Sequence, residues 1–160
     1  MVSKAREAEV WSRVMAASAQ APESCNPKPR STLTSAQVME LLEQELCDKV
    51  TCEALACRTH GAARQKLMFL ARQEGEHYKK LEAIYYLLTG EKPCPDRPKQ
   101  PCIACLSEEL RRRWQQETKS AHTYHCLAEK TGDFASEFHV LGSEEEKHAQ
   151  LLVQILQTCL

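Results

Sequence analysis

The chain has 160 residues, 27% of them charged, and a formal net charge of −1 at pH 7. This length is enough for one domain with a substantial core, and the balanced charge argues against a nucleic acid or an anionic membrane surface as partner. No apolar stretch is long enough to span a bilayer, and charged residues interrupt the N-terminal region where a secretory signal would be apolar.

The N-terminal part of the chain is predicted to lie outside the main domain. Residues 4–18 have the pattern of a short amphipathic helix, and residues 22–31 form a Pro-rich linker. We therefore expect residues 1–33 to be an N-terminal helix and linker, and residues 34–160 to be the folded domain.

Four further helices are predicted, and together they indicate an all-α chain. Thr34 and Gln37 form a capping box that opens the first of these helices. Residues 91–105 contain four prolines and are expected to be a long non-helical connection between the second and third helices. The helices are predicted to end near Gly61, Gly90 and Gly132, with Ser107 capping the third and Asp133 opening the fourth.

The second half of the chain repeats a pattern of the first half, with corresponding residues 71 or 72 positions apart. In each half a lone glutamate is followed, seven residues on, by a cysteine or tyrosine, and later by a Glu-x-x-His pair. The lone glutamates and pairs are Glu45, Glu74 and His77 in the first half and Glu117, Glu145 and His148 in the second.

These acids and histidines fall on apolar stripes. The stripe around Glu74 and His77, for example, is spaced alternately by three and four residues and runs from Leu67 to Leu88. The same reasoning places Leu41 and Trp114 on the inward stripes of the first and third helices. Buried carboxylates are costly unless they are paired or bound to metal, and two divalent cations would balance the charge of four glutamates. The sequence therefore predicts a dinuclear metal site inside a helical bundle.

A single Glu-x-x-His pair would be weak support, because exposed helices often contain one. The prediction depends on two copies at one offset, on core-phase positions, and on a lone glutamate before each pair. The chain's other histidines are expected to be structural or exposed: His60, His122, His125 and His139.

With these residues, the chain resembles the ferritin-like superfamily over residues 34–160, and most of all the diiron domain of rubrerythrins and their short relatives. The resemblance implies a four-helix bundle with one long crossover between helices 2 and 3. It also implies that the six residues are metal ligands, with Glu74 and Glu145 as bridges, and that Tyr124 corresponds to the tyrosine beside such sites.

The chain also departs from the rubrerythrin pattern. It has no rubredoxin-like pair of cysteine knuckles, and Ser120 stands where rubrerythrin has an extra glutamate. Asp48 holds the repeat-related position after Glu45. Asp48 either supplies the missing carboxylate to the reaction or bonds to a neighbouring histidine or arginine, and the sequence leaves both interpretations open.

Nine cysteines without a secretory signal indicate a reducing, cytoplasmic location. Cys52 is expected either beside the site or simply in the core. Three cysteines of the crossover have three possible roles: incidental thiols, a dithiol that passes electrons to the site, or, with Cys25, a thiolate zinc or iron site. These three are Cys94, Cys102 and Cys105.

Carboxylate and imidazole ligands suit iron or manganese, and zinc would fit without redox chemistry. The predicted function is that of a rubrerythrin-like oxidoreductase that holds two iron ions and reduces hydrogen peroxide with electrons from a separate donor protein. One alternative is a ferroxidase or iron-handling protein that uses dioxygen. The other is a non-catalytic, metal-stabilised interaction module, and a homodimer is left open.

Overall fold

A computed structural model describes residues 33–159. Within this range all regular structure is helical, which agrees with the predicted all-α class. The predicted helix over residues 4–18, the linker after it and Cys25 lie outside the described residues. The elements are α2 (Ser35–Cys57), α3 (Gly61–Thr89), α4 (Leu106–Lys130), the short 3-10 helix η1 (Gly132–Phe134) and α5 (Ala135–Cys159).

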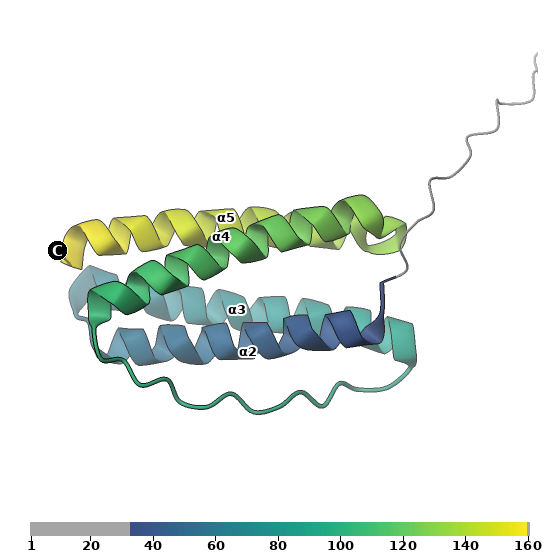
Figure 1. The fold of residues 1–160 in the computed structure, drawn as a ribbon, viewed down its shortest axis with the longest axis horizontal. Helices are drawn as coiled ribbons and strands as arrows, with labels where there is room; N and C mark the ends of the chain where they lie inside the picture. The colour runs from purple at the N-terminus through teal and green to yellow at the C-terminus, as the bar shows by residue number, and fades with distance from the viewer. Residues whose placement is uncertain (1–32, 160) are drawn as a thin grey trace, which may run out of the picture.

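The four long helices form a bundle of two hairpins, α2 with α3 and α4 with α5 (Figure 1). Short turns join the helices within each hairpin. The connection between α3 and α4 is much longer and runs along the bundle from one end to the other (Figure 1). Because of this connection, α4 starts at the end of the bundle where α3 also starts. None of the helices in residues 33–159 combines the length and the apolar character that a bilayer span needs.

The Pro-rich connection is attached to the bundle by a few specific contacts. Arg58, just after α2, donates a hydrogen bond to the backbone carbonyl of Ile103 at 2.9 Å, and the Ile103 side chain enters the core. Nearer the start of the connection, the backbone N–H of Asp96 donates to Glu43 on α2 at 3.3 Å. A segment without a helical hydrogen-bond ladder thus follows a defined path across the bundle.

The helix ends follow local chemistry. The predicted capping box is confirmed, because the Thr34 side chain accepts a hydrogen bond from the Gln37 backbone and the Gln37 side chain accepts one from Thr34. Gly90 ends α3 in the left-handed conformation, with a φ of 75°. Two predicted boundaries were wrong: Gly61 opens α3 with a φ of 55° rather than ending the first helix, and Cys105 rather than Ser107 is the N-cap of α4.

Two apolar clusters fill the bundle, one on each side of a polar layer. One cluster is built around residues such as Leu55, Leu70 and Ile155, and the other around residues such as Leu42, Leu81 and Phe138. The polar layer between them contains the predicted metal ligands. Buried charged groups are therefore confined to one level of the bundle, with water excluded from both sides.

Parts of the predicted stripes were wrong. Leu42 rather than Leu41 is fully buried on α2, and Leu88, in the last turn of α3, is 38% exposed. Spacing identifies a face of a helix, but it does not tell how far along that face the neighbouring helices extend.

Candidate metal centre

All six predicted ligands lie in the polar layer, with exposed fractions between 0% and 3%. Helices α2 and α4 each contribute one lone glutamate, and α3 and α5 each contribute a Glu-x-x-His pair. Residues three apart on a helix project from the same face about one turn apart, so each pair points into the bundle as a unit. The residues are Glu45, Glu74, His77, Glu117, Glu145 and His148.

One half of the cluster is centred on His77. Its Nδ1 atom lies 2.8 Å from Oε1 of Glu145, 3.3 Å from Oε2 of Glu74 and 3.4 Å from Oε2 of Glu45. We call these four atoms the His77 set.

The other half is centred on His148, whose ring stacks on that of His77 with 5.1 Å between the centroids. The Nδ1 atom of His148 lies 3.4 Å from Oε1 of Glu74, 3.6 Å from Oε2 of Glu145 and 3.8 Å from Oε2 of Glu117. We call these four atoms the His148 set. Glu74 and Glu145 each belong to both sets and direct one oxygen to each histidine.

The donor atoms fit a metal ion. Two ligands about 2.1 Å from the same ion are separated by roughly 3.0–3.4 Å. Three of the distances from the histidine nitrogens, those of 3.3, 3.4 and 3.4 Å, fall in this range, and the others run from 2.8 to 3.8 Å. Glu74, His77, Glu145 and His148 each offer one atom within 4.8 Å of all the others, so these four residues can hold a metal ion.

Several atoms of the cluster have no hydrogen bond within the described chain. Burying so many polar atoms without partners is costly, and a cation that they share would satisfy them. They are Oε2 of Glu45, Oε2 of Glu74, Oε2 of Glu117, Oε1 of Glu145, and Nδ1 of His77 and His148.

The ring of His77 is oriented by a residue that the sequence reasoning missed. Its Nε2 atom lies 3.1 Å from Oε2 of Glu144, which also accepts a hydrogen bond from Lys80 at 2.6 Å. A carboxylate on the outer nitrogen of a metal-binding histidine fixes the ring and leaves the inner nitrogen free for the ion. Only the position of Glu144 directly before Glu145 could have indicated it in the sequence.

Without a metal, the cluster retains protons. Burial raises the pKa of Glu45 from 4.5 to about 8. Burial alone would lower the pKa of each histidine, but the surrounding carboxylates outweigh it and raise the pKa of His77 to about 12 and that of His148 to about 11. Metal ions and protons therefore compete for the same atoms.

Tyr124 lies beside the cluster, as predicted. Its buried hydroxyl donates a hydrogen bond to Oε1 of Glu45, on the helix opposite its own. Burial raises the pKa of Tyr124 well above its usual value, so the hydroxyl is a neutral donor. The repeat-related Cys52 is fully buried in an apolar cluster, and burial also raises the pKa of its thiol.

Replacing Tyr124 with phenylalanine should lower the free energy of unfolding by about 1–3 kcal/mol, because Oε1 of Glu45 would remain buried without a donor. Urea unfolding would measure the change. Tyr86→Phe is the matched control, since Tyr86 is 54% exposed. Equal stability of the two variants would show that the hydrogen bond to Glu45 contributes little.

A buried arginine in the cluster is the main feature that the sequence reasoning missed. Arg113, only 3% exposed, lies one turn before Glu117 on α4. Its NH2 atom lies 2.5 Å from Oε1 of Glu117 and 2.9 Å from Oε1 of Glu74.

The predicted inward position of Trp114 was wrong, because Trp114 is 39% exposed and Arg113 takes the core position. Either residue could belong to the inward face of α4 by its spacing from Glu117. Tryptophan was predicted because an apolar side chain is more common in a core than an arginine.

The NH1 atom of Arg113 forms an ion pair with Asp48, which also accepts a hydrogen bond from Gln44 at 2.8 Å. Of the two interpretations of Asp48, the structure displays the contact with an arginine. Its role in a reaction remains a prediction.

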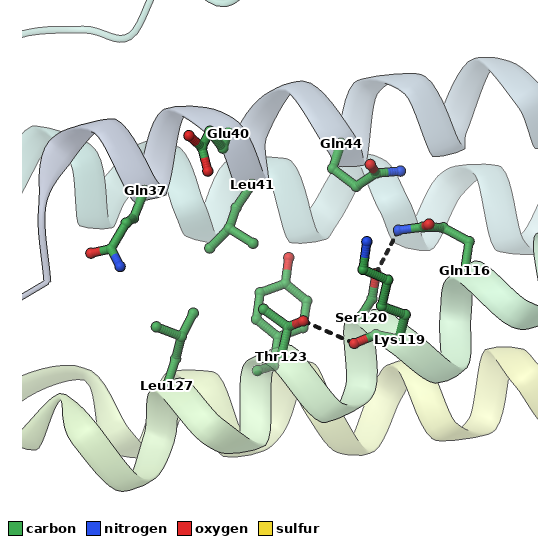
Figure 2. A pocket seen from close by; sticks show the side chains of 10 residues that line it. Gln37, Glu40, Leu41, Gln44, Gln116, Lys119, Ser120, Thr123 and Leu127 are labelled. Atoms are coloured by element: carbon green, nitrogen blue, oxygen red, sulfur yellow. Dashed lines mark hydrogen bonds between the residues drawn. The ribbon is translucent and has the colours of Figure 1, made fainter.

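A groove of about 290 Å³ lies between α2 and α4 (Figure 2). It reaches the cluster through Tyr124, which lines the groove and bonds to Glu45. Tyr124 and Ser120 line its inner side, and its rim carries the amides of Gln44 and Gln116 and the amine of Lys119. These two helices have little direct contact with one another, unlike the pairs within each hairpin. The groove therefore brings solvent close to the hydroxyl that contacts Glu45.

The crossover cysteines do not form a second site in the described part of the chain. Cys94, Cys102 and Cys105 are exposed, and no group of three or more metal-ligating side chains within residues 33–159 includes them. As expected, the remaining histidines lie outside the polar layer: His60, His122 and His139 are exposed, and His125 is half-buried against Glu146.

Comparison with protein-family models finds no match to this chain, and no curated protein or solved structure matches it either.

Proposed function

We propose that the chain is a ferritin-like dimetal carboxylate protein of the rubrerythrin type, which holds two iron ions and reduces hydrogen peroxide with electrons from a separate donor protein. One observation carries the proposal: Glu74 and Glu145 each direct one oxygen to His77 and one to His148. This is the arrangement of bridging carboxylates between two ions. Glu45 and Glu117 then complete the two sets at opposite ends.

The charges of the polar layer agree with two divalent ions. Asp48 and Arg113 form an ion pair and balance each other. The four glutamates of the cluster remain, and their charge equals that of two divalent cations. One divalent ion would balance only two of these carboxylates, and retained protons would have to neutralise the other two, because a buried net charge is costly.

The long connection between α3 and α4 supports the ferritin-like part of the proposal, because that architecture joins its two hairpins with a single crossover. The ligand types support iron or manganese, since hard carboxylates and imidazoles with no thiolate are typical of these metals.

The residues around the cluster suit a small oxidant. Two iron(II) ions bound there would supply two electrons, which together with two protons from solvent convert hydrogen peroxide to two water molecules. The groove between α2 and α4 carries polar side chains such as Gln44 and Gln116, and the Tyr124 hydroxyl that lines it holds a proton next to Glu45. The apolar clusters on both sides of the layer exclude bulk water.

The test is rapid mixing of the anaerobic, iron(II)-loaded protein with one equivalent of hydrogen peroxide or with dioxygen, followed by absorbance. We expect oxidation by peroxide to be much faster. Iron(II) in the same buffer without protein is the control for oxidation in free solution. Faster oxidation by dioxygen, with iron released as mineral, would support a ferroxidase instead. Bound iron that reacts with neither oxidant would indicate a metal-stabilised module.

A further inference from the structure

The two halves of the cluster have matching ligands but different neighbours. Positions 72 residues apart correspond in this part of the repeat, so Arg113 corresponds to Leu41 and Ser120 to Asp48. The arginine and the aspartate both lie in the polar layer, whereas Leu41 is half-buried at the groove. The surroundings of the His77 set and the His148 set are therefore unequal.

At the His77 set, the neighbour is a neutral donor. The Tyr124 hydroxyl bonds to Oε1 of Glu45, while Oε2 of the same carboxylate faces His77 without a hydrogen bond. A neutral hydroxyl orients the carboxylate and does not repel a cation that binds its other oxygen.

At the His148 set, the neighbour is a fixed cation. The Arg113 guanidinium contacts Oε1 of Glu117, and it also contacts Oε1 of Glu74, the oxygen that faces His148. An arginine stays protonated at any physiological pH. An ion that enters the His148 set must therefore share the Glu74 oxygen with this guanidinium or displace the guanidinium from it. The distances from Nδ1 to the carboxylate oxygens are also longer in the His148 set, at 3.4–3.8 Å, than in the His77 set, at 2.8–3.4 Å.

Arg113 is held in this position by contacts on more than one side. Its side chain is buried, and its second nitrogen is paired with Asp48, which Gln44 holds in turn. The guanidinium thus stays against the oxygens of Glu74 and Glu117 and competes with a metal ion for them.

We infer that Arg113 makes the two ion positions unequal, so that the His77 set fills first and the His148 set binds its ion more weakly. This inference rests on the proposed dimetal function. A guanidinium nitrogen 2.9 Å from an oxygen lies within about 5 Å of any ion bound to that oxygen, since such bonds are about 2.1 Å long. At that separation, even water-like screening leaves a repulsion worth roughly tenfold in affinity.

The inference is tested by titrating the metal-free full chain with Co²⁺, followed by calorimetry and by the visible bands of bound cobalt. The wild type should bind two ions in steps about tenfold or more apart. The double variant Asp48→Asn/Arg113→Gln removes a balanced ion pair, so the net charge is unchanged. In this variant the second step should tighten until the two steps merge, with the first unchanged.

Each other outcome is informative. Two equal steps in the wild type, or steps that stay equally far apart in the double variant, would overturn the inference and leave the dimetal function standing. Absence of binding by the wild type would overturn the proposed function itself. One ion in the wild type and two in the double variant would support the inference, and one ion in both would overturn it.

Two single variants provide a test that does not depend on the folding of the double variant. Glu117→Ala should lose the weak step and keep the tight one, whereas Glu45→Ala should lose the tight step and keep the weak one. The opposite pattern would show that the His148 set fills first, and the inference would be wrong.

Discussion

Replacement of Glu145 by alanine should reduce the metal content below two ions per chain. Glu145 contributes one oxygen to the His77 set and the other to the His148 set, so a single truncation removes a ligand from both. Glu74→Ala should have the same effect for the same reason. Metal-to-protein ratios after equilibrium dialysis against iron(II) or Mn²⁺ would measure the loss.

The adjacent residue offers a matched control. Glu146→Ala makes the same chemical change one position along α5, but the Glu146 side chain is 58% exposed and its carboxylate faces His125, which lies outside the polar layer. This variant should keep the wild-type metal content, and so should His122→Ala and His139→Ala. If the histidine variants lost metal while Glu74→Ala and Glu145→Ala retained two ions, the cluster would not be the metal site.

Removal of the metal should lower the melting temperature, and the loss should grow as the pH rises from 6.5 to 8. In the metal-free protein His77 and His148 have pKa values of about 12 and 11, above the ordinary 6.5. The native state therefore keeps protons that the unfolded chain releases above pH 6.5. This stabilisation is complete below pH 6.5 and is lost as the pH rises through the native pKa values.

Glu45 has the same effect on stability, because its pKa is raised from 4.5 to about 8 in the native state. The stabilisation from its retained proton decreases above pH 4.5 and is lost by about pH 8. Glu145 acts in the opposite direction, because its pKa is lowered to about 2, but its contribution changes only below pH 4.5. For each proton that the native state binds in excess of the unfolded state, the free energy of unfolding falls by about 1.4 kcal/mol per unit rise in pH.

The metal-loaded protein is the control for this effect, since its ligands are already deprotonated and bound metal stabilises the native state. Melting curves of chelated and loaded protein at pH 6.5 and pH 8 should diverge with pH. An unchanged melting temperature after complete chelation would argue against a buried metal site. A chelated protein that gained stability over this range would show that the histidines are not protonated in the native state.

Much of the site was predictable from the sequence because it depends on relations within single helices. A pair such as Glu74 and His77 shares a helix face whatever the rest of the fold does, and the repeat provides the second copy. The capping box at Thr34 is likewise a local interaction, and so its position could be read correctly.

Relations between helices were decided only by the tertiary structure. Successive residues of a helix differ by about 100° around its axis, so the rotation of α4 about its own axis decides whether Trp114 or Arg113 is the inward residue. The sequence allows both arrangements. The packing of α4 against its neighbours selects the one that brings Arg113 to Asp48 and Glu74.

The direction of individual atoms depends on the same long-range contacts. Which oxygen of Glu74 faces His77, and which residue bonds to the outer nitrogen of that histidine, follows from side chains far apart in the chain. Helical periodicity was enough to predict the glutamates and histidines of the cluster, because it acts over three or four residues. The inequality of their surroundings comes from contacts across the bundle, which no local pattern encodes.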